Sequence, residues 1–193
     1  YNNPINKVFL YVVWNTGLRS KSLRELRWSW IDKRDSAINI PKEFVKTRTK
    51  FKCPLTPKAL SMIESLRGID KTYVFLGNKN KPVSDSTPRI AFQKLIAKSI
   101  PDGENISIHG FRTTLNLVAT RSRNYTTEVI ESQLTHAYAQ QIRRVYLGNL
   151  DYFDERKELL NWYEEWGAKE KQRFIEVNGL DEKKAKLASG DLF

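Results

Sequence analysis

Residues 37–55 read AINIPKEFVKTRTKFKCPL, and this stretch decides the fold class because most of the remaining chain carries helical patterns. Apolar side chains alternate with polar ones around Ile38 and Ile40, and a second alternating stretch covers residues 46–52. A period of two is typical of strands with one buried face. We therefore predict an α+β, mainly α fold: a helical bundle with a small antiparallel sheet of about three short strands.

The segments on either side of this stretch have helix signals. Asn3 and Pro4 are typical of an N-cap and a first helical turn, and Gly17 follows the apolar run that ends at Trp14. Residues 73–76 predict a short extended piece, and residues 169–193 are too charged and too poor in apolar side chains to be held firmly. The predicted helices cover residues 4–14, 21–28, 57–66, 86–100, 110–121, 127–134, 139–147 and 151–166.

The chain has 193 residues, of which 40% are hydrophobic, so it is long enough for one substantial core. The longest apolar run, residues 8–14, is too short to span a bilayer, and no leader precedes it. We therefore expect a soluble cytoplasmic protein with no membrane partner. Because Tyr1 stands where an initiator Met is expected, we also expect the natural protein to extend further upstream.

Charged side chains are distributed unevenly along the chain. Residues 1–150 hold 25 basic and 11 acidic side chains, whereas residues 151–193 hold 8 and 11. A basic excess of this size suits a polyanion, so nucleic acid is the leading partner, although a basic surface can also be simply solvated. Cys53 is the only cysteine, which excludes an internal disulfide and a thiolate zinc site, and we expect no metal or other cofactor.

Four short segments carry the residue types that cleavage of a phosphodiester without a metal requires. Such cleavage needs a nucleophile, cations around the non-bridging oxygens, and an acid for the leaving oxygen. Arginine suits the second task because its planar guanidinium matches phosphate geometry and stays charged. The segments are TGLR at residues 16–19, HGFR at residues 109–112, QLTH at residues 133–136 and RRVY at residues 143–146.

In their order, and in the spacing from His136 to Tyr146, these segments resemble the active-site boxes of tyrosine recombinases, the phage integrase family. The run at residues 154–166 resembles the segment after the last box in integrases of genomic islands and satellite prophages. The resemblance covers about residues 5–166. It implies Tyr146 as the nucleophile, Arg19 and Arg112 as ligands of the scissile phosphate, His109 as a neighbouring acid or base, and His136 as the second histidine of the site.

A lysine on the small sheet would complete the site, because the family uses one as general acid for the leaving 5′ oxygen. Lys46 fits this role best and Lys50 is the alternative. Unbroken strand alternation would put the basic side chains of residues 46–52 on one face, whereas a turn near residues 48–50 would divide them. The side chains that we predict to contact DNA are Arg48, Lys50, Lys52, Arg143 and Arg144.

Two positions depart from the pattern of the family. Ser22 stands where a glutamate is usual, which weakens an orienting contact near Arg19. Thr135 stands where a smaller residue is more usual. Neither departure changes which residues the boxes select.

The resemblance implies a site-specific recombinase that integrates or excises a mobile element through a 3′-phosphotyrosyl intermediate, without a cofactor. Its partner would be double-stranded DNA, bound by a homotetramer on synapsed sites, with a monomer for the isolated domain. Residues 1–166 would form the catalytic domain, lacking N-terminal DNA-binding domains. Residues 167–193 would form a charged C-terminal tail.

Two other functions stay open at this stage. A type IB topoisomerase uses the same tyrosine chemistry without strand exchange, and a pure DNA-binding module would use the basic surface without chemistry. Single residues also have ordinary explanations: Arg19 as a surface arginine, the lysines of residues 46–52 as protection of an edge strand, and Tyr146 as a packed core tyrosine. The four boxes in their order together favour the recombinase.

Overall fold

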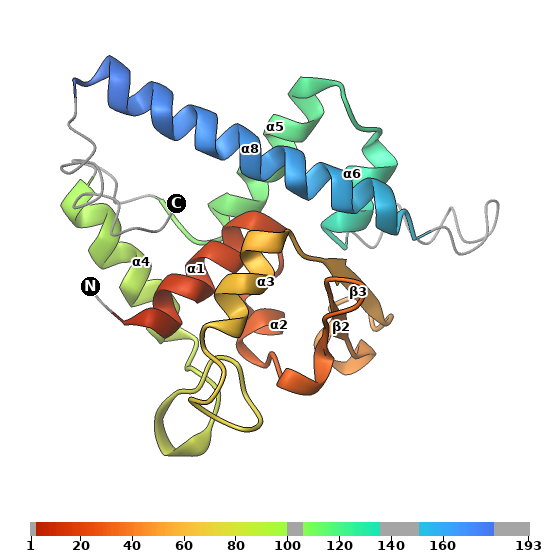
Figure 1. Cartoon of the computed structure of the whole chain (residues 1–193), viewed down its shortest axis with the longest axis vertical. Coiled ribbons are helices and arrows are strands. Elements are labelled where there is room, and N and C mark those ends of the chain that lie inside the picture. Colours follow the sequence, from red (N-terminus) through yellow and green to blue (C-terminus); the bar gives the residue numbers. More distant parts are fainter. Residues whose placement is uncertain (1–2, 100–105, 136–150, 180–193) are drawn as a thin grey trace.

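The computed structural model describes residues 3–99, 106–135 and 151–179. Its architecture is mainly helical with one small antiparallel sheet, which confirms the predicted fold class. Figure 1 shows the long helix α8 (Phe153–Val177) lying across α1 (Pro4–Thr16), with the sheet on the opposite side of the molecule from α4 (Ser86–Ser99).

Helix α1 is at the centre of the core. Asn3 caps it, because its side-chain Oδ1 accepts the backbone N–H of Ile5 at 2.9 Å, and Pro4 occupies the first turn. Residues 8–16 are all buried. The helix ends at Gly17, whose φ of 63° lies in the left-handed region that glycine adopts without a steric penalty. The predicted start and stop of this helix are confirmed.

The sheet has its strands in the order β1 (Ile31–Asp32), β2 (Ala37–Ile40) and β3 (Phe51–Pro54), all antiparallel. Ile38 on β2 pairs with Cys53 on β3, and both side chains are fully buried. The prediction of three short strands is therefore confirmed. Their placement differs, because the first strand precedes residue 37.

The alternating residues 46–52 are a strand only from Phe51 onward, so the prediction of an unbroken strand is wrong for residues 46–50, and the alternative of a turn in this stretch is confirmed. The chain instead forms the short 3-10 helix η2 (Lys42–Phe44) and then a loop, in which Arg48 has a φ of 52°. Residues 46–50 are Lys, Thr, Arg, Thr and Lys, so their alternation offers no apolar face to bury.

The other helices follow the predicted order along the chain. Bridges between Arg27 and Tyr73 and between Leu76 and Pro82 confirm the extended piece at residues 73–76. The helix that we predict over residues 139–147 lies outside the described residues. The remaining bounds are α2 (Ser20–Arg24), which ends earlier than predicted, α3 (Pro57–Glu64), α5 (Gly110–Ser122), α6 (Thr127–Gln133), η1 (Trp28–Trp30) and η3 (Asn78–Asn80).

Helix α8 continues well past the predicted end at residue 166. Gly167 packs directly on the ring of Trp14, and a Cβ at this glycine would lie 2.3 Å from the ring. Beyond it, an ion pair between Glu170 and Arg173 and a hydrogen bond from Gln172 to Glu176 connect neighbouring turns. The charged residues 169–177, predicted to be loosely held, are therefore helical.

Candidate active site

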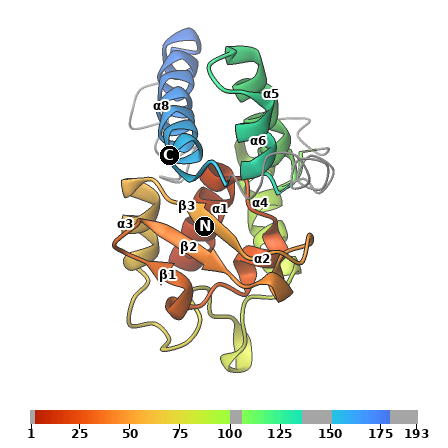
Figure 2. The same ribbon diagram turned by 90° about the vertical axis from the view of Figure 1, so that its right-hand side faces the viewer.

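Three helix ends meet at the candidate site. Figure 2 shows α5 and α6 together at one end of the molecule, next to the end of α1. Gly17 is the C-cap of α1, Leu134 is the C-cap of α6, and α5 begins after His109. The last carbonyls of a helix have no partner within it and carry a partial negative charge, which favours a cation nearby.

The guanidinium of Arg112 binds the carbonyl ends of α1 and α6. Arg112 lies in the first turn of α5, where its Nη1 donates to the carbonyl of Gly17 and its Nη2 donates to the carbonyl of Leu134 at 2.6 Å. Only 5% of the residue is exposed. The guanidinium therefore joins the ends of α1 and α6 and is fixed in one place.

Arg19 lies two residues after the end of α1 and reaches the same region. It occupies the N-cap position of α2 with extended backbone, and its side chain is half-buried. Its Nη1 donates to the hydroxyl of Thr135 at 2.6 Å. Because Arg112 binds Leu134 and Arg19 binds Thr135, the structure brings the two predicted phosphate ligands together at the residues that precede His136.

The two guanidinium groups make this region strongly electropositive. Burial, and then the positive charge of Arg19, lower the pKa of Arg112 to about 10, although the carboxylate of Glu131 acts in the opposite direction. Burial also lowers the pKa of Arg19. None of the ion pairs seen within residues 3–99, 106–135 and 151–179 involves either arginine. A bound anion would therefore relieve both the repulsion and the cost of desolvation.

His109 lies at the entrance of α5, as the sequence predicts. Its carbonyl accepts the backbone N–H of Arg112 at 3.1 Å, and the residue is exposed. The histidine therefore lies at the surface, three residues before the buried arginine.

The lysine predicted as general acid lies on the loop between η2 and β3 and not on a strand. Lys46, Arg48 and Lys50 are all exposed there. The hydroxyl of Ser22, on α2, donates to the carbonyl of Phe44 at 2.7 Å and so attaches the start of this loop to the helix that follows Arg19. The serine that replaces the usual glutamate thus has an orienting contact of its own.

Lys52 differs from the other basic residues of this segment because it is engaged in the fold. It lies on β3, where its ammonium forms an ion pair with Asp35 and approaches the ring of Phe153 at 4.7 Å. A DNA contact by Lys52 would have to compete with both interactions. The predicted site residues His136, Arg143, Arg144 and Tyr146 lie outside the described residues.

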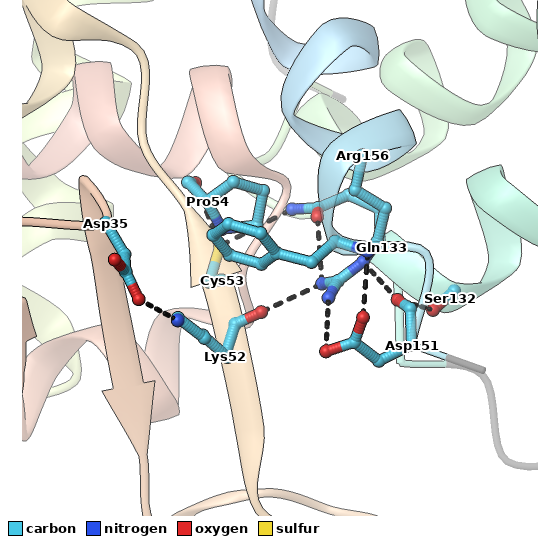
Figure 3. Close-up of polar contacts among 9 residues, drawn as sticks. Asp35, Lys52, Cys53, Pro54, Ser132, Gln133, Asp151 and Arg156 are labelled. Carbon is cyan, nitrogen blue, oxygen red and sulfur yellow. Dashed lines mark hydrogen bonds and ion pairs between the residues drawn. The ribbon is translucent and has the colours of Figure 1, made fainter. Parts of the chain in front are cut away.

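Sequence reasoning missed Arg156, the largest fully buried side chain described. Figure 3 shows its guanidinium between β3, α6 and the start of α8. Its Nε donates to the carbonyl of Asp151 at 2.8 Å, its Nη1 donates to the carbonyl of Lys52 at 3.0 Å, and its Nη2 lies 3.9 Å from the Asp151 carboxylate. A signal was present, because Arg156 shares the helical spacing of the buried residues Leu159, Leu160 and Tyr163.

Gln133 links this buried arginine to the candidate site. Its Nε2 donates to the carbonyl of Thr16 at 2.7 Å. Its Oε1 accepts from Nη1 of Arg156 at 3.5 Å, as Figure 3 shows. Because Arg156 also holds Asp151, it connects the residues on either side of the segment 136–150. Burial raises the pKa of the neighbouring Cys53 thiol to about 11, so this thiol is a packing group and not a nucleophile.

The ligand chemistry of the described residues is that of cationic side chains. No group of three or more His, Cys, Asp and Glu side chains in that part of the chain could hold a metal ion. None of the described helices is both long and apolar enough to cross a membrane. The described part of the site therefore offers guanidinium groups to a ligand, and these suit a phosphate.

Comparison with known proteins identifies similar sequences. Residues 2–151 match the phage integrase family. Prophage integrase IntZ of Escherichia coli (strain K12) is 33% identical over 151 residues, which cover 77% of this chain and 36% of that protein. The integrase of Shigella phage Sf6 is 26% identical over 156 residues, covering 78% of this chain and 39% of that protein.

The integrase of Enterobacteria phage P4 is 25% identical over 178 residues, covering 84% of this chain and 40% of that protein. The chain thus spans less than half of the length of these relatives. All three matches extend over most of the chain, and the family match includes both arginines that meet at the end of α6.

Proposed function

Because the chain belongs to the phage integrase family, we propose that it is the DNA-cleaving domain of a site-specific recombinase. The observation that carries the proposal is the meeting of Arg19 and Arg112 at residues 134–135, directly before His136. Two guanidinium groups held side by side can bind both non-bridging oxygens of one phosphodiester. They would also stabilise the additional negative charge of the transition state.

The reaction proceeds by two displacements at phosphorus. The phenol oxygen of Tyr146 attacks the scissile phosphate, the bond to the 5′ oxygen breaks, and that oxygen takes a proton to leave as a hydroxyl. His109 and His136 assist the loss of the phenol proton. A 5′ hydroxyl from the partner strand then attacks the phosphotyrosine, the bond to tyrosine breaks, and Tyr146 regains its proton.

The general acid for the 5′ oxygen is Lys46, with Lys50 as the alternative. Both lie exposed on one loop, but Lys46 is two residues from Phe44, whose carbonyl is held by Ser22 next to Arg19. A short connection to a fixed point limits the range of positions of a side chain. This contact favours Lys46 and leaves Arg48 and Lys50 for the DNA backbone, together with Arg143 and Arg144.

A nicked duplex that loses its 5′ hydroxyl after cleavage tests the proposal, because it traps the covalent adduct. The purified chain is expected to form an adduct of protein and DNA, Tyr146→Phe is expected to form none, and the control Tyr152→Phe is expected to react normally. An adduct in Tyr146→Phe would overturn the choice of nucleophile. DNA binding without any adduct would leave a binding module only.

The choice between the two lysines has its own test. A 5′-bridging sulfur makes a leaving group that needs no acid, so it should restore cleavage to a variant that lacks only the general acid. We expect Lys46→Met to be slow on the normal duplex and close to wild type on the sulfur-substituted one. If Lys50→Met shows this behaviour and Lys46→Met does not, the assignment moves to Lys50.

The whole protein would act on double-stranded DNA as a homotetramer on two synapsed sites, in the bacterial cytoplasm at the nucleoid, to integrate or excise a prophage or genomic island. Residues 1–166 would be its catalytic domain and residues 167–193 a charged C-terminal segment, with α8 running across this boundary. Recombination between two sites by the full-length protein supports this. Relaxation of supercoiled DNA without recombination would favour a type IB topoisomerase.

A further inference from the structure

Thr135 has an unusual backbone conformation for its residue type. It follows α6 with a φ of 51°, in the left-handed region that β-branched residues rarely adopt. Its side chain is nevertheless buried, with 5% of the residue exposed. Glycine would fit this backbone without strain, so the threonine is retained at a conformational cost.

The hydroxyl of Thr135 has a specific partner across the site. It accepts a hydrogen bond from Nη1 of Arg19 at 2.6 Å, over a sequence separation of 116 residues. Hydrogen bonds from a charged donor are shorter and stronger than those between neutral groups. The contact therefore selects one position of a long and otherwise flexible side chain.

Arg19 needs such a contact because its neighbour repels it. The positive charge of Arg19 is one of the causes that lower the pKa of Arg112, so the two guanidinium groups are close enough to interact. Arg112 is fixed by two carbonyls, whereas the side chain of Arg19 is only half-buried. Without an acceptor on the inner side, repulsion and side-chain entropy would both favour an Arg19 that turns toward solvent.

We propose that Thr135 is a positioning residue that holds the guanidinium of Arg19 beside Arg112 before DNA binds. The proposal rests on the proposed function, in which Arg19 is a ligand of the scissile phosphate. Donors that are already in place need no reorganisation when negative charge builds up on the phosphate in the transition state. The hydroxyl acts through Arg19, so it affects the cleavage step more than the affinity for DNA.

Three substitutions separate the hydroxyl from the strained backbone. Thr135→Ser keeps the hydroxyl, Thr135→Val keeps the shape without it, and Thr135→Gly removes the hydroxyl while relieving the strain. The Ser variant is expected to form the covalent adduct at close to the wild-type rate. The Val and Gly variants should be slower by about tenfold, the value of a hydrogen bond to a charged group, with DNA affinity changed by less than about twofold.

The Gly variant distinguishes positioning from a purely structural role. Thr135→Gly should unfold at the same or a higher urea concentration than the wild type, because glycine suits the left-handed backbone, and yet it should cleave slowly. A residue that only ends α6 would show no loss of cleavage when replaced by glycine. That result would overturn the proposal.

A substrate with a methylphosphonate at the scissile position gives a second readout. A methyl group in place of one non-bridging oxygen removes the negative charge, so the contribution of Arg19 should fall. The rate deficit of Thr135→Val is expected to shrink on this substrate to less than about twofold. A general disturbance of the fold would slow both substrates equally and would contradict the proposal.

The outcomes also separate this inference from the function on which it depends. If the wild type forms the adduct, Tyr146→Phe does not, and Thr135→Val cleaves at the wild-type rate, the recombinase function stands and the role of Thr135 is rejected. If the wild type forms no adduct on any substrate, the proposed function itself fails.

Discussion

Arg112 and Arg156 are both buried arginines, but their charges are balanced in different ways. Arg156 has the carboxylate of Asp151 at 3.9 Å and lies over the ring of Phe51 at 4.9 Å, in addition to its hydrogen bonds to carbonyls. Arg112 binds the carbonyls of Gly17 and Leu134 and, in the described part of the chain, is part of no ion pair.

We infer from this difference that Arg156 is a structural cation and that Arg112 is placed to bind an anionic ligand. Burial lowers the pKa of Arg156 as well, but the negative charges of Asp151 and Glu155 act against this shift, so the desolvation cost is partly offset within the fold. Arg112 instead lies next to a second cation, Arg19, which raises the cost of its charge. The two positive charges at the candidate site have no ion-pair partner among the described residues, and a bound phosphate would supply one. Burial alone would not distinguish these two arginines, whereas their partners do.

The largest expected effect is the loss of cleavage in Arg112→Met. Removing one fixed cationic donor from a phosphoryl-transfer site should slow adduct formation by at least about 100-fold. The stability cost should be only about 1 kcal/mol, because two carbonyls lose a donor while an unpaired buried charge is relieved. Single-turnover cleavage and urea unfolding measure the two quantities. Arg121→Met, an exposed change on the same helix, is the control.

Arg156→Met should show the opposite pattern, with a larger loss of stability and a smaller loss of cleavage rate than Arg112→Met. Loss of a buried charged donor with this many acceptors should lower the free energy of unfolding by about 3 kcal/mol, as measured by urea denaturation. Under conditions in which the variant is fully folded, its cleavage rate should fall less than that of Arg112→Met. Arg173→Met, an exposed change on α8, should leave the stability unchanged. Equal effects on rate and stability in the two buried-arginine variants would contradict the separate roles of Arg112 and Arg156.

A smaller effect is expected for Ser22→Ala, which releases the loop between η2 and β3, with Lys46 and Lys50, from α2. The variant loses one partly buried hydrogen bond, so its free energy of unfolding should fall by about 1 kcal/mol and its cleavage should slow several-fold. The rate deficit should disappear on the duplex with a 5′-bridging sulfur, because the general acid is not needed there. A deficit of equal size on both duplexes would show that the contact does not act through the lysine. Ser29→Ala is the matched surface control.

The smallest effect concerns the alkylation of Cys53, which reports how tightly Arg156 and its hydrogen-bond partners pack around the thiol. Burial raises the pKa of this thiol to about 11, so iodoacetamide at pH 8 should leave the native protein unlabelled. In Arg156→Met the labelling should be faster, because the loosened packing exposes the thiol by more than the loss of the arginine charge, which raises the pKa of the thiol further, slows the reaction. Since Cys53 is the only cysteine, mass spectrometry of the intact chain gives the rate directly. Rapid labelling of the native wild type would contradict the buried network.

The elements that were predictable from the sequence have local signals. Asn3, Pro4 and Gly17 specify the two ends of α1 through backbone chemistry, and the structure confirms both ends. The helical pattern over residues 110–121 likewise predicted α5, which begins at Gly110. Where residues within one turn determine the conformation, the sequence is sufficient.

The predictions that failed depended on distant partners or on a missing apolar face. Residues 46–50 alternate in the manner of a strand, but they have nothing to bury against β2. Arg156 is buried because acceptors from residues 52, 133 and 151 surround it, and no spacing within α8 shows these partners. The meeting of Arg19 with Thr135 likewise depends on how α1 and α6 pack.

The contact between Gly167 and Trp14 also constrains how the sequence can change during evolution. Because α8 lies directly on the indole ring, an alanine at position 167 would require either a smaller side chain at position 14 or a displaced helix. The two positions should therefore vary together among relatives that share this packing. A large aromatic residue opposite a glycine, or two residues of medium size, would both fill the space, and a mixed pair would not.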